Sequence, residues 1–186
     1  MRFSASAVLL GVLVLSGCDP VSFSAPVGIN LKTKASDVKT GVVTEDKGIT
    51  TESGNPYGAF ISDARENLDG KDPATIEISS LTLLLGAQST GVTALEQVFT
   101  GKVEVLFVMN DTDNSYPVGN ITDPKGGGPV ELDVTFDSDT ITGEDRTKLL
   151  GGSFKTVIRG PAAASFAPPS NAEANLQLTF TFEAYD

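Results

Sequence analysis

Six consecutive polar residues, 110–115, carry oxygen atoms of the kind that a calcium ion binds. The segment reads Asn-Asp-Thr-Asp-Asn-Ser, and Ca²⁺ takes about six to eight oxygen ligands from carboxylates, amides, carbonyls and water. We therefore treat Asp111 and Asp113 as candidate calcium ligands. Further acids expected to converge on this site lie later in the chain, at Asp123, Asp137 and Asp139.

Two observations weaken the calcium interpretation of this segment. The helix–loop–helix calcium motif needs a glycine where Tyr116 stands and a Glu at its twelfth position, and this sequence has neither. A run of Asn and Asp is also typical of a hairpin turn, because these side chains hydrogen-bond to nearby backbone groups. We favour the turn and keep calcium binding as the alternative.

A pair of carboxylates, Glu131 and Asp133, is a candidate for acid–base chemistry. The two residues are separated by one position, so on a single strand both side chains point to the same face. A glycosidase needs two acids about 5 to 9.5 Å apart and no histidine. The chain has no Trp and only three Tyr to stack on sugars, so a solvated strand face explains the pair better than hydrolysis does.

The residue types that are missing restrict the function more than those that are present. The chain has no His and a single Cys, so it lacks the commonest general base and the usual transition-metal ligands. Its 24 acidic residues outnumber 13 Lys and Arg, for a net charge of −11, and such a surface repels nucleic-acid phosphates. We predict a protein that is not an enzyme and does not bind nucleic acid.

The single cysteine, Cys18, stands at the end of an apolar segment near the start of the chain. The basic residue Arg2 precedes an apolar run over residues 3–15, and the run ends in Leu15-Ser16-Gly17-Cys18. As a helix, this run would reach about 20 Å, which is short of a hydrocarbon core of about 30 Å. The segment therefore has the features of a secretory signal, and its last four residues resemble the lipobox of bacterial lipoproteins.

The resemblance to bacterial lipoproteins implies a location and an anchor. It implies that residues 1–17 are a signal peptide that is removed, and that Cys18 carries a diacylglyceryl group and an acyl chain such as palmitate on its new amino terminus. The protein is then held on the membrane by lipid, in the cell envelope and outside the cytoplasm. Asp19 favours the plasma membrane, as in enteric lipoproteins with Asp at this place, while the outer membrane remains the alternative.

The residues after the cysteine predict a single domain with almost no tether. Residues 18–20 form the lipidated end, and from Val21 apolar residues alternate with polar or small ones to Leu31, which is typical of a half-buried strand. Pro26 indicates that this strand lies at a sheet edge or is bent. We expect one domain over residues 21–186, with its first strand paired to its last, so that both ends of the chain lie near the membrane.

The rest of the chain is predicted to be mainly strands. Residues 32–75 are polar and indicate loop, with one helix over residues 57–68 that begins after Asn55-Pro56 and ends at Gly70. A second helix is expected over residues 143–150, with Thr142 as its cap. A β-bulge is expected at Ser79-Ser80. Strands are predicted at residues 76–85, 103–109 (central in its sheet), 130–136, 154–159 and 176–184.

These elements predict an antiparallel two-sheet β-sandwich with one or two short helices. An open barrel is the alternative. For function, we favour a non-enzymatic protein-interaction or structural module that is anchored by lipid and binds an envelope protein. A calcium- or glycan-binding module is the second hypothesis, and a carboxylate-based hydrolase is the third.

Overall fold

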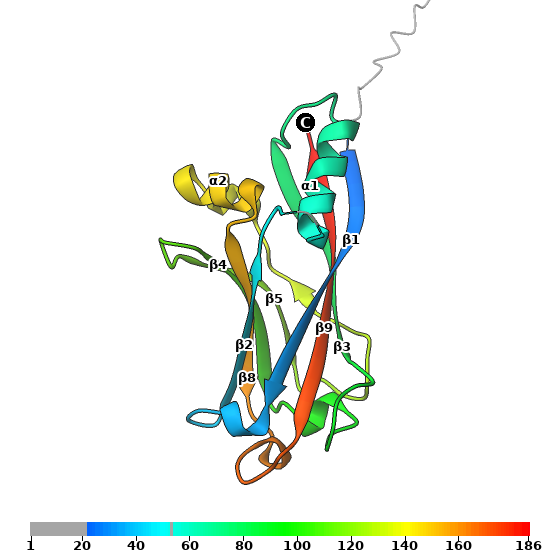
Figure 1. Ribbon diagram of the computed structural model, residues 1–186, viewed down its shortest axis with the longest axis vertical. Coiled ribbons are helices and arrows are strands. Elements are labelled where there is room, and N and C mark those ends of the chain that lie inside the picture. The colour runs from blue at the N-terminus through cyan, green and yellow to red at the C-terminus, as the bar shows by residue number, and fades with distance from the viewer. Residues whose placement is uncertain (1–21, 53) are drawn as a thin grey trace, which may run out of the picture.

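Two antiparallel sheets face each other in the computed structural model of this protein, which describes residues 22–52 and 54–186. The signal peptide (1–17), Cys18 and the short tether (18–20) lie outside the described residues, and so does Val21. The sheets form two layers, with β1, β9 and β3 in one and β2, β8, β4 and β5 in the other (Figure 1). The predicted β-sandwich is confirmed, and the open barrel is not what forms.

The elements follow one another along the chain with helices at only a few places. The strands are β1 (Ser22–Lys34), β2 (Val42–Ile49), β3 (Thr75–Leu85), β4 (Lys102–Met109), β5 (Ser115–Thr122), β6 (Val130–Glu131), β7 (Asp133–Val134), β8 (Phe154–Pro161) and β9 (Glu173–Tyr185). The α-helices are α1 (Pro56–Asn67) and α2 (Gly143–Gly151). Short 3₁₀ turns are η1 (Ala35–Asp37), η2 (Leu95–Gln97), η3 (Ser138–Thr140) and η4 (Ala164–Phe166).

The first and last strands pair along their whole length, as expected from their alternating patterns. In the four-stranded sheet the order is β1-β9-β3-β6, so β1 is an edge strand and its Pro26 removes no ladder bond from a central position. The register runs from Ser22 opposite Tyr185 to Lys34 opposite Glu173. The start of β1 and the end of β9 therefore lie at the same end of the sandwich (Figure 1).

Two finer predictions about strands are also confirmed. The register between β3 and β9 shifts between Ile78 and Ser80, which is the bulge that the Ser79-Ser80 pair indicated. The five-stranded sheet has the order β2-β8-β4-β5-β7, so β4 is its central strand. Leu106 on β4 is buried although it alternates out of phase with the core residues on either side.

The core between the sheets is a cluster of aromatic rings joined to α1. Phe107 of β4 lies 4.7 Å from Phe154 and 6.4 Å from Phe182 between ring centroids. Tyr57 of α1 packs edge-on against Phe154 of one sheet and Phe182 of the other. Helix α1 thus fills the space between the two sheets at one end of the sandwich.

Both helices begin and end close to the predicted positions. Asn55 caps α1 by accepting a hydrogen bond from the Tyr57 backbone amide at 3.0 Å. Gly70 lies just after the end of α1 and has a left-handed backbone conformation, at φ +82°. Thr142 is the N-cap residue of α2, but its side chain forms no capping bond, so that part of the prediction is wrong. The buried Tyr57 hydroxyl donates to the Leu149 carbonyl at 2.9 Å and links α1 to α2.

Two strands were not predicted, and both are weakly patterned. Residues 32–75 contain β2, which the loop prediction missed because β2 is an edge strand that buries only Val43 and Ile49 among charged residues. Strand β5 is interrupted in sequence by Pro117 and Gly119, and a register shift opposite Val105 makes two consecutive β5 residues face the core. Each of these two strands forms because it pairs with a well-patterned neighbour: β2 pairs with β8, and β5 pairs with β4.

The predicted strand over residues 130–136 is wrong in a specific way. Its alternation is real, because Leu132 is buried while its neighbours Glu131 and Asp133 are exposed. The segment nevertheless crosses from one sheet to the other: β6 pairs with β3, and β7 pairs with β5. Alternation reports which residues face inward and does not report which sheet they join.

Candidate functional site

The residues predicted to bind calcium form the tip of the β4–β5 hairpin. Asp111 and Asp113 both have left-handed backbone conformations, at φ +66° and +55°, which Asp tolerates better than most residues. The Thr112 amide donates to the Asn110 carbonyl at 2.8 Å, and the Asp113 amide donates to the Met109 carbonyl at 3.1 Å. The tip is built as a turn, the interpretation that the sequence favoured.

A carboxylate from α2, Asp145, holds this hairpin tip in place. It accepts hydrogen bonds from the Thr112 hydroxyl (2.8 Å), the Asn114 amide (2.7 Å) and the Tyr116 phenol (2.7 Å). These bonds stabilise the ionised form, those from Tyr116 and Asn114 most, and they hold the pKa of Asp145 below its ordinary value. The bond to Asp145 also raises the pKa of Tyr116.

A lysine from the same helix, Lys148, carries positive charge to the hairpin tip. Its ammonium lies 2.9 Å from Glu144 and 3.7 Å from Asp111, and it donates to the Asn110 carbonyl. The bond to Glu144 raises the pKa of Lys148, so the group stays charged. The Asp111 carboxylate thus already forms an ion pair with a lysine of the protein. Calcium binding at Asp111 and Asp113 stays a prediction.

The other acids expected to join this site lie elsewhere. Asp123 is at the far end of the β4–β5 hairpin, where it accepts a hydrogen bond from the Gly101 amide at 2.6 Å. Asp137 caps η3 by accepting from the Asp139 amide at 3.0 Å. Within residues 22–52 and 54–186, no group of three or more His, Cys, Asp or Glu is placed to hold a metal ion. The expectation that these acids converge is therefore wrong.

The two acids of the candidate acid–base pair belong to different strands. Glu131 lies on β6 in the four-stranded sheet and Asp133 lies on β7 in the five-stranded sheet. Both side chains are exposed. The premise that a single strand presents both acids is therefore wrong.

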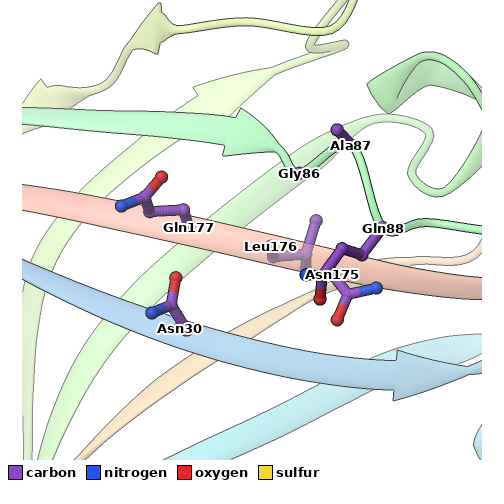
Figure 2. Close-up of a pocket in the computed structure, with 7 residues that line it drawn as sticks. All are labelled: Asn30, Gly86, Ala87, Gln88, Asn175, Leu176 and Gln177. Atoms are coloured by element: carbon purple, nitrogen blue, oxygen red, sulfur yellow. The ribbon is translucent and has the colours of Figure 1, made fainter.

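A hollow on the outer face of the four-stranded sheet is lined by carboxamides, and sequence analysis did not identify it. Its volume is about 460 Å³, and it lies over β9 between β1 and the turn that follows β3. Figure 2 shows Asn30 on β1, Asn175 and Gln177 on β9, and Gln88 beyond the turn at Gly86 and Ala87. Asn30 and Gln177 stand directly opposite each other in the register.

The carboxamides in this hollow have no partner in the described protein. None of the side chains of Asn30, Gln88, Asn175 and Gln177 hydrogen-bonds to another described residue, although the Asn175 amide nitrogen of the backbone donates to Ser89. Five other carboxamides bond within the protein, whereas the side chains of Asn120 and Asn171 form no bond to a described residue. The five are Asn55, Asn67, Gln97, Asn110 and Asn114. The hollow therefore offers free donors and acceptors at one place.

No family model matches the sequence, and no curated protein matches it either. No helix in the described part of the chain is long and apolar enough to cross a membrane.

Proposed function

We propose that this chain is a lipid-anchored protein of the bacterial cell envelope whose β-sandwich acts as a non-enzymatic protein-interaction or structural module. The lipobox resemblance at residues 15–18 supports the anchor. The observation that carries the proposal is the short sequence separation between Cys18 and the first strand: β1 begins at Ser22 and pairs with β9 from that residue. Four residue steps span at most about 14 Å, so the lipid is attached almost directly to a strand of the sandwich.

The short connection orients the body on the bilayer in this proposal. The end of the sandwich that carries Ser22 and Tyr185 faces the lipid, together with the loop after α1. That loop exposes Asp69, Lys71 and Asp72, so its net charge is negative and it gains nothing from anionic head groups. Attachment then depends on the acyl chains, at about 0.8 kcal/mol for each buried CH₂. Asp19 favours the plasma membrane, with the outer membrane as the alternative.

A groove between the edges of the two sheets is the surface that we propose for a protein partner. It has a volume of about 230 Å³ and is lined by residues 27–30 of β1, residues 47–49 of β2 and residues 55–56 at the start of α1. Both β1 and β2 are edge strands. Edge strands offer unpaired backbone groups to an extended segment of another protein.

The lipid anchor is tested by replacing Cys18. In a Cys18→Ser protein we expect the membrane-bound fraction to fall from nearly all to nearly none, because no thiol is left to carry the diacylglyceryl group. The measurement is fractionation of cells with mass spectrometry of the amino terminus. Ser16→Ala is the matched control, since it keeps a small residue in the lipobox and should stay lipidated. Wild-type protein without a lipid mass increment would contradict the proposal.

The partner is tested by photo-cross-linking in intact cells, from single positions of the lipidated protein. A cross-linking residue at Ser24 on β1 or at Lys47 on β2 should capture the same single envelope protein, because both are exposed at the two edges. The control position is the exposed Thr135, which follows β7 at the other edge of its sheet. No capture at Ser24 and Lys47, or the same products from Thr135, would remove the support for a protein-binding edge.

A further inference from the structure

We infer that the carboxamide hollow on the outer face of β1, β9 and β3 binds a neutral oligosaccharide. This site goes beyond the proposed function, because it needs neither the lipid nor a protein partner. A carboxamide has two N–H donors and one carbonyl acceptor. A sugar hydroxyl is both a donor and an acceptor, so adjacent hydroxyls of a sugar ring can pair with a carboxamide through two bonds. Four free carboxamides around one hollow match a ligand rich in hydroxyls.

The charges beside the hollow are paired with one another. Most outward positions of the three strands are uncharged, in a chain with 37 charged residues, 13 basic and 24 acidic. They are Ser24, Pro26, Gly28 and Asn30 on β1, Asn175, Gln177, Thr179 and Thr181 on β9, and Ser79, Ser80, Thr82 and Leu84 on β3. Lys32 of β1 lies directly opposite Asn175, and it shares Glu173 with Lys34, at 2.7 and 3.2 Å. An anionic ligand would therefore have to break an ion pair to reach a cation here.

The position of the hollow on the sheet excludes an added peptide strand. It lies over β9, whose backbone is paired with β1 on one side and β3 on the other. An extended peptide needs an open edge to form backbone hydrogen bonds, and β9 has no open edge, so its outward face offers side chains. A ligand must therefore be recognised through Asn and Gln, which suits hydroxyl groups.

Glycines beside β9 keep the hollow open. A β-carbon at Gly86 would lie 3.3 Å from the Asn175 carbonyl oxygen, and one at Gly28 would lie 3.5 Å from the Gln177 amide nitrogen. With hydrogen atoms at these two positions, the carboxamides are bordered by space and not by side chains. The resulting volume of about 460 Å³ falls within the range of small-molecule sites, about 300 to 1,000 Å³.

The test uses the protein as purified from cells, kept in detergent micelles and titrated with neutral cellohexaose, maltohexaose and hexa-N-acetylchitohexaose. Hexagalacturonate is the acidic comparison, and binding is read by saturation-transfer NMR. Because no aromatic ring lines the hollow, affinity rests on hydrogen bonds, and we expect a Kd of about 1 mM for at least one neutral hexamer. Hexagalacturonate should not bind.

Variants connect the binding to the hollow. The double substitution Asn175→Ala and Gln177→Ala should weaken binding about tenfold, from the loss of two hydrogen-bonding groups. Both side chains face outward, so its Tm should stay within about 2 °C of the wild type. Asn120→Ala, a half-buried carboxamide on β5 of the other sheet, should bind as the wild type does.

Three results would overturn the inference. They are no binding of any neutral hexamer, equal binding of hexagalacturonate, and unchanged binding by the folded double variant. Because the measurement is made in micelles without cells or partners, it is independent of the Cys18 and cross-linking experiments. If the lipid anchor proved wrong, the oligosaccharide inference would be unaffected. If no oligosaccharide bound, the proposed lipid anchor would be unaffected.

Discussion

Phe107→Ala should lower the free energy of unfolding by about 3 to 5 kcal/mol. Phe107 is fully buried at 0 % exposure, and its ring lies within 6.4 Å of four other rings, those of Phe136, Phe154, Phe180 and Phe182. These rings come from β4, β8, β9 and the segment after β7, so they draw on both sheets. Removal of the ring leaves a cavity that the paired strands cannot collapse to fill.

The measurement is urea unfolding followed by circular dichroism. Phe136→Ala is the matched control: its ring is half-buried and contacts Phe107 alone among the aromatic residues described, so its cost should be clearly smaller. Phe107→Leu keeps most of the volume and should fall between the two. If Phe107→Ala and Phe136→Ala lowered the free energy of unfolding equally, the ring cluster would not be the centre of the core.

The parts of the fold that were predictable are those in which local pattern and tertiary role agree. Strand β9 alternates without interruption and is buried on one face between two neighbours, so its 13 residues reveal both its type and its inward side. Helix α1 has a side-chain cap and an apolar stripe whose members, Phe60 and Ala64, are both buried. Strand β2 lacks such a pattern, because an edge strand with solvent on most sides needs few apolar residues.

The candidate sites were less predictable because they depend on residues far apart in the chain. Asp145 bonds to side chains 29 to 33 positions earlier, and nothing near it in sequence indicates that contact. The carboxamide hollow did leave a signal: positions 175 to 181 of β9 alternate inward apolar residues with Asn, Gln and Thr, where a very acidic chain would be expected to place charges. The sequence pattern alone does not identify the site, because the site also needs Asn30, which the pairing of β1 with β9 places opposite Gln177.

Asp145→Asn should lower the Tm at neutral pH by roughly 5 °C, the second large effect that we expect. The carboxylate accepts three hydrogen bonds, and an amide in its place presents N–H groups to donors such as the Asn114 amide and the Tyr116 phenol. The bonds to an ionised group are stronger than those to a neutral one. The hairpin tip would then lose the bonds to Asp145 and keep only those to Lys148 of α2, while the sandwich itself stays folded.

The pH dependence of this difference identifies the carboxylate as its cause. Because the pKa of Asp145 is lowered in the folded protein, its contribution is fully present above the unfolded value of about 3.9 and is lost as pH falls through the folded pKa. The gap in Tm between wild type and Asp145→Asn should therefore be constant above about pH 5 and close below about pH 4.

The variant should also lower the pKa of Tyr116, seen by tyrosinate absorbance, since Asp145 is what raises it. Asp139→Asn, an exposed acid whose side chain forms no bond among the described residues, is the control and should change neither quantity. A gap that persists unchanged at low pH would show that packing, and not the ionised carboxylate, holds the hairpin tip.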